Sequence, residues 1–318
     1  MRALLLLLSL LHSWPALAES WTADPRNGCR VRNDARAPGE VPLWDGACVA
    51  GAAEGPGRLV WIARDRPVFI FEGTMRSGAM HGDGAFELLN GQRYEGQFAD
   101  GLPSGTGVYT WPSGSRYEGG FREGQFHGRG VRIWGGDSPF AGDRYEGDFV
   151  EGRRTGKGLY LFANGDRYEG DFVDGKITGR GIYAYPDGGY YDGELLDGRY
   201  NGQGFRLWAN GDRYWGEFLD DERTGEGVYI WATGQRYEGT FIDGKRHGHG
   251  AYLWPGESLY VGDFARDRMS GKGLRIWADG RRYDGGWADD QRHGDGWCVD
   301  PAGDNGACRC VANECSFK

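Results

Sequence analysis

The sequence has no excess of basic residues, no long apolar run and no collagen-like repeat. Its 37 Lys and Arg residues are outnumbered by 46 Asp and Glu, giving a net charge of −9, whereas a dedicated nucleic-acid-binding protein normally carries a basic surface. The apolar stretch from Ala3 to Leu11 is too short for a membrane-spanning helix. Glycine supplies 59 of 318 residues without a G-X-Y period, so it must serve turns. With 39% hydrophobic and 14% aromatic residues, the chain is not a disordered tail either.

Residues 1–18 resemble a secretory signal peptide. Met1-Arg2 supplies a basic start, a leucine-rich core follows, and Ala16-Leu17-Ala18 is an A-x-A cleavage motif. We therefore expect the mature chain to begin at Glu19 and to be exported, as a periplasmic or secreted protein. All six cysteines lie in the exported part, and an even count in an oxidising compartment predicts disulfides.

Most of the remaining sequence is one repeat of 23 residues. Phe71-Glu72-Gly73 opens the first regular copy, and a degenerate copy precedes it at Trp44-Asp45-Gly46. One interval is longer, by five residues near 135–142. The sequence thus predicts an N-terminal cap with the degenerate repeat over 19–70, ten repeats over 71–297 and a Cys-rich cap over 298–318. The motif Tyr94-Glu95-Gly96-Gln97-Phe98 recurs at Tyr117, Tyr145, Tyr168, Tyr191, Tyr214, Tyr237, Tyr260 and Tyr283.

Each copy has the pattern of a β-hairpin. Residues 93–98 alternate as one strand and 107–111 as the next, with a Gly-rich loop over 100–107 between them. Asn90-Gly91, Ser113-Gly114 and their equivalents then suggest two-residue type I′ turns into the following copy. We therefore predict an all-β fold: an elongated, single-layer antiparallel meander of tandem hairpins with disulfide caps.

These copies resemble the MORN (membrane occupation and recognition nexus) repeat, whose signature is Y-E-G-x-F/W-x-x-G-x-x-x-G-x-G. The resemblance runs from Trp44 to about Trp297, with local departures such as Leu195 in place of the Phe and Asp221 in place of a loop Gly. It implies binding to other proteins, to a second copy of the chain or to phospholipid head groups. Some MORN arrays accompany a catalytic domain, for which this chain leaves almost no room.

An aromatic ladder follows the second strands, and it is the first candidate binding surface. Its structural interpretation is that the rings cover the Gly-rich backbone; its functional interpretation is a platform on which sugar rings or an extended peptide stack. The position two residues earlier is Tyr or Arg. The tryptophans of this ladder are Trp111, Trp134, Trp208, Trp231, Trp254 and Trp277, with Phe162 and Tyr185 in the remaining copies.

A row of basic residues at the loop tips is the second candidate surface. Such a row could meet lipid phosphates or another anionic polymer. Acidic residues lie beside it, which favours a charged edge that prevents aggregation. The candidate basic edge comprises Arg153, Arg154, Lys176, Arg199, Lys245 and Arg246.

The cysteines fall at the two ends of the repeats. Cys29 and Cys48 flank the degenerate copy and form the expected pair. Cys298, Cys308, Cys310 and Cys315 allow three connectivities. Disulfides would hold the caps that an open meander needs; the rival interpretation is a redox or zinc-binding tail.

The sequence carries no motif that indicates catalysis. A G-x-S-x-G elbow, a P-loop and a metal triad are all missing from it. We expect no enzyme, no cofactor and no bound metal, but an exported scaffold that associates with a protein partner or with itself. The alternatives are binding of a cell-wall glycan through the Trp/Tyr ladder and binding of phospholipid head groups through the basic edge.

Overall fold

The structure, a computed structural model, describes residues 20–32, 39–136 and 138–318; the expected signal peptide lies outside them. All regular structure in these residues is strand, 27 in number, and no helix that could cross a membrane occurs among them. The chain divides into two compact units. The first holds the described residues up to Asn164 together with Phe172–Gly175, and the second holds Gly165–Asp171 and Lys176–Lys318.

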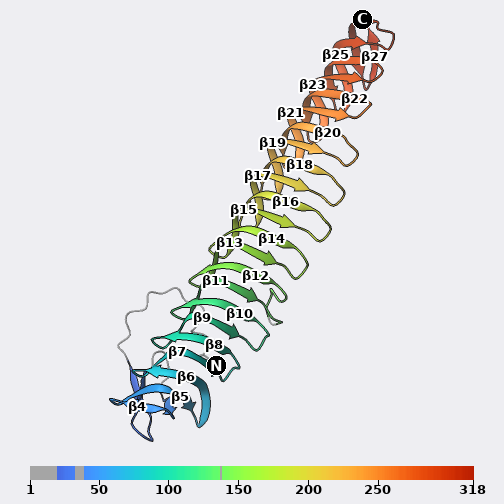
Figure 1. The fold of residues 1–318 in the computed structure, drawn as a ribbon. Helices are drawn as coiled ribbons and strands as arrows, with labels where there is room; N and C mark the ends of the chain where they lie inside the picture. The colour runs from blue at the N-terminus through green and yellow to red at the C-terminus, as the bar shows by residue number, and fades with distance from the viewer. Residues whose placement is uncertain (1–19, 33–38, 137) are drawn as a thin grey trace. The chain divides into compact units, whose positions relative to one another are not determined.

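In the first unit, consecutive strands from β5 onward pair antiparallel, as an open meander (Figure 1). A cap precedes them, in which β3 and β4 both pair with β5, and β2 meets β5 in parallel. The strands of this part are β1 (Trp21–Ala23), β2 (Arg30–Arg32), β3 (Val41–Trp44), β4 (Ala47–Val49), β5 (Ala52–Ala63), β6 (Arg66–Arg76), β7 (Ala79–Leu88), β8 (Arg93–Ala99), β9 (Leu102–Thr110), β10 (Arg116–Arg122), β11 (Gln125–Ile133), β12 (Arg144–Val150) and β13 (Arg153–Leu161).

The second unit continues the same antiparallel pairing from β15 to β27. Strand β14 (Arg167–Val173) contributes residues to both units. The others are β15 (Lys176–Ala184), β16 (Tyr190–Leu196), β17 (Arg199–Leu207), β18 (Arg213–Leu219), β19 (Glu222–Ile230), β20 (Arg236–Ile242), β21 (Lys245–Trp254), β22 (Ser258–Ala265), β23 (Arg268–Trp277), β24 (Arg282–Ala288), β25 (Gln291–Val299), β26 (Asn305–Val311) and β27 (Glu314–Phe317).

The short turn and the longer connection of each copy lie at the opposite ends from those that the sequence predicts. Strands β8 and β9 pair from Arg93↔Thr110 to Ala99↔Leu102, so only Asp100-Gly101 connects them. Their φ values of 51° and 88° are those of the tight turn in which both central residues lie in the left-handed region. The predicted loop over 100–107 is therefore wrong, and the second strand begins at Leu102. Within the Gly-rich segment, Gly107 lies beneath the Tyr94 ring of the partner strand, whereas Gly105, with φ of 90°, faces the Gln97 side chain.

The connection at Asn90-Gly91 is the longer one. Leu88 N–H donates to Gln92 O at 2.9 Å and Gly91 N–H to Leu88 O at 2.8 Å, which leaves three residues in the loop. Gly91 has φ of 79°, whereas Asn90 is not among the described residues with positive φ. The predicted two-residue type I′ turn is therefore wrong here, and likewise at Ser113-Gly114, where Trp111 N–H donates to Ser115 O. The Asn90 side chain instead accepts the Gln92 N–H at 3.1 Å.

A buried ring over a pair of glycines is the structural unit of each copy. Tyr94 is fully buried and covers Gly96 and Gly107, which face each other across β8 and β9. A Cβ on Gly107 would lie 2.5 Å from the Tyr94 ring, and one on Gly96 2.6 Å from its hydroxyl oxygen, so no other residue fits. The Tyr94 hydroxyl donates to Gln97 O at 2.8 Å. The expected close approach of rings to the Gly-rich backbone is confirmed, but these tyrosines provide it rather than the tryptophan ladder.

Neighbouring copies are joined through the same rings. Tyr94 meets Phe98 of its own copy edge-to-face at 5.0 Å and Phe121 of the next copy at 4.9 Å. Tyr214 repeats this with Phe218 at 5.1 Å and Phe241 at 5.2 Å. Such contacts are favourable for aromatic quadrupoles. The core is therefore a line of edge-to-face rings on one sheet face, and each copy depends on its neighbour.

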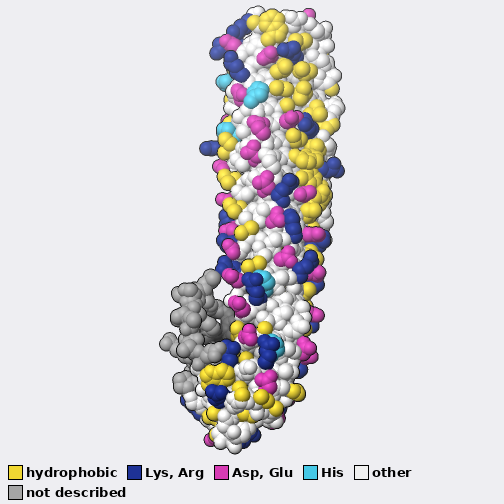
Figure 2. Space-filling model, turned by 60° about the vertical axis from the view of Figure 1, so that its left-hand side comes forward, with side chains coloured by type: hydrophobic (Ala, Val, Ile, Leu, Met, Phe, Trp, Pro, Cys, Tyr) yellow, Lys and Arg dark blue, Asp and Glu magenta, His cyan; other side chains and the backbone are white. Residues whose placement is uncertain are grey.

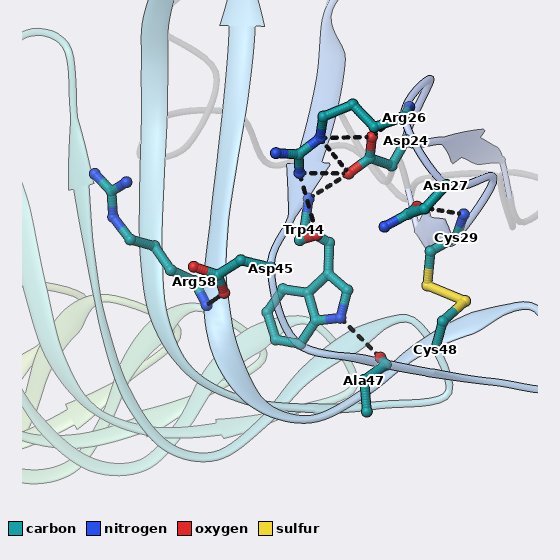
Figure 3. A network of polar contacts seen from close by, with 9 residues as sticks. All are labelled: Asp24, Arg26, Asn27, Cys29, Trp44, Asp45, Ala47, Cys48 and Arg58. Carbon is teal, nitrogen blue, oxygen red and sulfur yellow. Dashed lines mark hydrogen bonds and ion pairs between the residues drawn. A yellow bond between two sulfur atoms is a disulfide. The ribbon is translucent and has the colours of Figure 1, made fainter.

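The degenerate first copy keeps this arrangement with a different ring. Trp44, 1% exposed, covers Gly46 and Gly57, and its Nε1–H donates to Ala47 O at 2.8 Å, three residues on, as the tyrosines do. Buried Asp24 accepts the Trp44 N–H at 2.7 Å and pairs with Arg26 (Figure 3). Burial works to raise the pKa of Asp24, but the hydrogen bonds from Arg26 and Trp44 outweigh it and hold the pKa below its usual value.

Candidate functional site: an aromatic face interleaved with arginine

We call the sheet face that carries the buried tyrosines and the tryptophan ladder the aromatic face. In the second unit the ladder rings are half-buried and in contact from copy to copy. Trp208 lies 5.5 Å from Tyr229, Tyr229 lies 4.5 Å from Trp231, and Trp231 lies 5.2 Å from Tyr252. Tyr252 and Trp254 are 4.1 Å apart. The residues between the tryptophans thus complete a continuous row.

The first unit has the same row. Tyr109 and Trp111 lie 4.4 Å apart, and the guanidinium of Arg132 lies 3.7 Å from the Trp111 ring centre. Trp134 follows, 5.6 Å from Tyr160. The structure therefore brings the sequence-predicted tryptophans of each unit together with the Tyr and Arg residues that precede them.

Most tyrosines of the row are fixed by an acceptor 17 residues earlier. Tyr229 donates to Asp212 Oδ2 at 2.6 Å, and Asp212 Oδ1 also accepts the Ala232 N–H at 2.8 Å. Burial works to raise the pKa of Asp212, but these hydrogen bonds win and lower it. Tyr109 donates in the same way to Gln92 at 2.6 Å. The row is therefore held in one conformation before any partner arrives.

Three copies depart from this pattern. Arg132, Arg206 and Arg275 replace the tyrosine, and the acceptor position is then Ser115, Gly189 or Ser258, never a carboxylate. Arg275 donates to the Ser258 hydroxyl at 3.0 Å. The sequence shows the change from Tyr to Arg and the change at the acceptor position. That the two changes occur together becomes clear only in the folded register, which places residues 17 apart side by side. Each guanidinium lies over a ring of the preceding copy: Arg132 over Trp111 at 3.7 Å, Arg206 over Tyr185 at 4.2 Å and Arg275 over Trp254 at 4.4 Å.

Two of these guanidinium groups are incompletely satisfied. The Nη1 atoms of Arg132 and Arg206 are buried, and no described residue accepts a hydrogen bond from them. Burial lowers the pKa of Arg132 to about 10, because the charged form loses hydration. A buried cation is normally paired with an anion. Arg132 is an exception, and its incomplete hydrogen bonding lowers the stability of the fold.

The predicted basic edge divides between two environments. Arg153 pairs with Asp174 at 3.0 Å and Lys176 with Asp197 at 2.6 Å. Arg199 lies 3.7 Å from Asp220, and Lys245 is exposed at the start of β21. Figure 2 shows the resulting mixture of acidic and basic side chains on the visible face. The edge is thus largely neutralised by the turn of the next copy, and exposed pairs of this kind contribute little to stability.

Arg154 and Arg246 turn onto the aromatic face instead. Arg154 lies 5.0 Å from the Tyr160 ring centre, and Arg246 lies 5.0 Å from that of Tyr252. Arg246 also donates to Asp267 O at 2.6 Å. These two side chains therefore extend the row of rings and cations.

The cysteines are all paired. Cys29 bonds to Cys48, as expected (Figure 3), and the C-terminal connectivity is Cys298–Cys308 and Cys310–Cys315. The sulfurs of Cys298, Cys310 and Cys315 lie within 4.8 Å of one another. Because cysteine binds zinc as the thiolate, these disulfide-bonded cysteines do not fit a zinc site.

The buried tyrosines packed on glycine recur in most copies, while the residues of the aromatic row vary between Tyr and Arg. The protein is therefore a tandem β-hairpin repeat protein, whose copies share one scaffold and differ in the side chains on the aromatic face. The chain belongs to the MORN repeat family, since the family model matches more than half of it. The matches cover residues 94–116, 117–137, 145–167, 168–190, 191–213, 214–236, 237–258, 260–281 and 283–305. The copies opening at Trp44 and Phe71 precede these matches.

Other comparisons add little. None of the curated proteins compared with the sequence matches it. Among solved structures, the TCP domain of SAS-4 from Drosophila melanogaster, in complex with a proline-rich motif of Ana2, is 15% identical with a TM-score of 0.31, covering 48% of this chain and 83% of that one. Inactive virginiamycin B lyase from Staphylococcus aureus, with quinupristin, is 10% identical with a TM-score of 0.15, covering 91% and 87%. TM-scores this low do not establish a shared fold.

Proposed function

We propose that this MORN-repeat protein is an exported, non-catalytic scaffold that holds a segment of a partner polypeptide against its aromatic face. The observation that carries the proposal is the continuous, internally fixed row of rings and arginines. A row already held by contacts such as Tyr229 to Asp212 loses little side-chain entropy on binding. Aromatic and arginine side chains are also the residues enriched where proteins bind one another.

The ring geometry favours a polypeptide over a glycan. Sugar stacking needs a free ring face, but the Arg132 guanidinium lies 3.7 Å from the Trp111 centre. Trp254 lies between Tyr252 at 4.1 Å and Arg275 at 4.4 Å. At these two rings the guanidinium group is what a partner meets, and it suits backbone carbonyls and carboxylates.

The basic edge supports lipid binding poorly, because ion pairs such as Arg153–Asp174 and Lys176–Asp197 neutralise it. Export rests on residues 1–18 and fits three disulfides, which persist in oxidising compartments. Non-catalytic character is supported by repetition, since each side-chain arrangement recurs along the chain rather than forming one unique site.

Peptide display against the mature protein tests the proposal, with Trp231→Ala as the site variant. Trp231 contacts Tyr229 and Tyr252 on the aromatic face. Trp215→Ala is the matched control, because Trp215 is 44% exposed and lies beside Phe205, away from the row. We expect enriched peptides to lose binding to Trp231→Ala and to keep it with Trp215→Ala.

Co-sedimentation with cell-wall sacculi and with anionic liposomes, each at low and high salt, tests the other two functions. Salt-resistant pelleting with sacculi that Trp231→Ala abolishes would replace the proposal with glycan binding. Salt-sensitive pelleting with liposomes that requires Arg153 and Lys176 would replace it with lipid binding.

A further inference from the structure

We infer that the aromatic face selects acidic polypeptide segments, whose carboxylates are bound on the first unit by Arg132 and, separately, on the second unit by Arg206 and Arg275. This inference rests on the proposed function and specifies the chemistry of the partner. Its basis is the coupled substitution of two positions that touch: wherever the row carries Arg, the acceptor position has lost its carboxylate or amide.

The repeat itself shows what a self-sufficient copy looks like. At Asp143 and Tyr160, the tyrosine hydroxyl donates to Asp143 Oδ2, and the Ala163 N–H donates to Asp143 Oδ1 at 2.8 Å. At Ser115 and Arg132, the Ser115 hydroxyl oxygen accepts the equivalent Gly135 N–H at 2.8 Å. The backbone contact is thus kept, while the group that would neutralise Arg132 is removed.

The exposed part of the Arg132 guanidinium is available to a ligand. Arg132 is partly exposed, and no described residue accepts a hydrogen bond from its buried Nη1. Trp111 at 3.7 Å and Trp134 at 5.7 Å hold the group between two rings. A guanidinium presents paired N–H donors that match a carboxylate, and the surrounding rings strengthen that contact by excluding water.

A polymer fits better than a small anion because the arrangement recurs. In the second unit, Tyr185, Arg206 and Trp208 repeat as Trp254, Arg275 and Trp277. The two sets are three copies apart, or about 29 Å at six strand spacings. One extended chain with several carboxylates could reach both sites, and linked contacts gain affinity together.

Because the protein has a net charge of −9, attraction of an acidic partner must come from the local charge of the aromatic face. Acidic side chains lie at the turns and opposite the aromatic face, as in the exposed pair Arg116–Glu118. On the aromatic face itself, the Asp212 carboxylate accepts hydrogen bonds from Tyr229 and Ala232 but keeps its charge. An acidic segment is therefore attracted where the row carries Arg132, Arg206 or Arg275, and not at the copies that carry Asp beneath a tyrosine.

The experiment compares poly-L-glutamate with polygalacturonate, a carboxylated glycan, using fluorescence anisotropy at low and high salt. Arg132→Gln removes the site. Arg129→Gln is the matched control, because Arg129 is exposed on the same strand, opposite Asp148, and causes the same change in net charge. The double variant S115D/R132Y restores the Asp143 and Tyr160 pattern and should fold as well as the wild type.

We expect poly-L-glutamate to bind the wild type and Arg129→Gln equally, and Arg132→Gln and S115D/R132Y about tenfold more weakly, as for a lost charge-assisted hydrogen bond. Absence of poly-L-glutamate binding, or equal weakening by Arg129→Gln, would overturn the inference. So would preferential, Arg132-dependent binding of polygalacturonate. Self-association that Arg132→Gln abolishes would identify a second copy as the occupant and also contradict it.

Different results would refute the acidic selectivity and the scaffold function. Displayed peptides that need Trp231 but lack acidic residues and ignore Arg132→Gln would leave the scaffold function standing and refute the acidic selectivity. Failure of any peptide to bind the aromatic face would refute the function first.

Discussion

Substituting Gly227 by Ala tests whether rings packed on glycine hold the array together. Gly227 has no positive φ, so alanine is not strained by the backbone. Its Cβ would, however, lie 2.6 Å from the Tyr214 ring. That ring cannot move aside, because Phe218 and Phe241 meet it at 5.1 and 5.2 Å and its hydroxyl donates to Glu217 O at 3.1 Å.

The expected magnitude follows from two opposing effects. Alanine in place of glycine in a strand gains about 0.5–1 kcal/mol from the unfolded state. Overpacking in a closed core costs about 1–3 kcal/mol. The clash wins, so we expect a net local destabilisation of about 1–2 kcal/mol. Gly136→Ala is the control, since no atom lies within 4 Å of its Cβ and its φ is not positive.

Hydrogen exchange read by mass spectrometry is the assay, because a repeat array need not unfold in one step. Peptides from β18 and β19 should exchange roughly tenfold faster in Gly227→Ala, about the ratio that 1.4 kcal/mol gives. Adding Tyr214→Leu should remove the clash, so the double variant should be less destabilised than the two single effects summed. Exchange in Gly227→Ala equal to that in Gly136→Ala would refute the reasoning.

Three further predictions concern pH, hydrogen bonding and the caps. Burial raises the pKa of Tyr94 and of Tyr145 to about 12. Because the folded state favours the protonated phenol, the resulting contribution to the free energy of unfolding is complete below the tyrosine pKa of the unfolded chain, near 10, and is lost as pH rises through 12. The part of the phenolate absorbance that appears above pH 10 should therefore rise together with the loss of β-sheet circular dichroism, and titration of all 17 tyrosines near pH 10 in a folded protein would contradict this. Tyr229→Phe removes the donor to Asp212 and should cost about 1 kcal/mol in urea unfolding, whereas an unchanged midpoint would show that the contact is dispensable. Non-reducing peptide mapping should find 29–48, 298–308 and 310–315; reduction should speed exchange in β25–β27 and leave β18 unchanged, and a general loss of protection would argue against local caps.

The strand content and period could be predicted because each copy restates the same evidence. One Tyr-x-Gly-x-Phe segment is weak, but its recurrence from Tyr94 to Tyr283 indicates alternating strands at a fixed spacing. The same recurrence predicts the degenerate copy, and Trp44 performs the role of the tyrosines there.

The turns could not be predicted from the same pattern. Asp100-Gly101 and Asn90-Gly91 both tolerate positive φ, so local chemistry does not choose between them. The choice depends on register: Tyr94 must lie over both Gly96 and Gly107, and this pairing leaves two residues at one end and three at the other. Gly107, one of the glycines that suggest a loop, is therefore a strand residue selected by a ring, while Gly101 belongs to the turn.

Only part of the candidate site could be predicted from the sequence, for a related reason. Trp111 and its equivalents stand out in the sequence, but the group that fixes or frees each neighbour lies 17 residues away and becomes its neighbour only in the folded register. In a repeat array the positions that keep one residue type identify the structural scaffold, as Tyr94 and its equivalents do from Tyr94 to Tyr283. The informative positions are those where two contacting residues change together. Ser115 with Arg132 is such a pair, and it leaves a charge without the partner that neighbouring copies supply to their tyrosines, at a stability cost that binding of a carboxylate would offset.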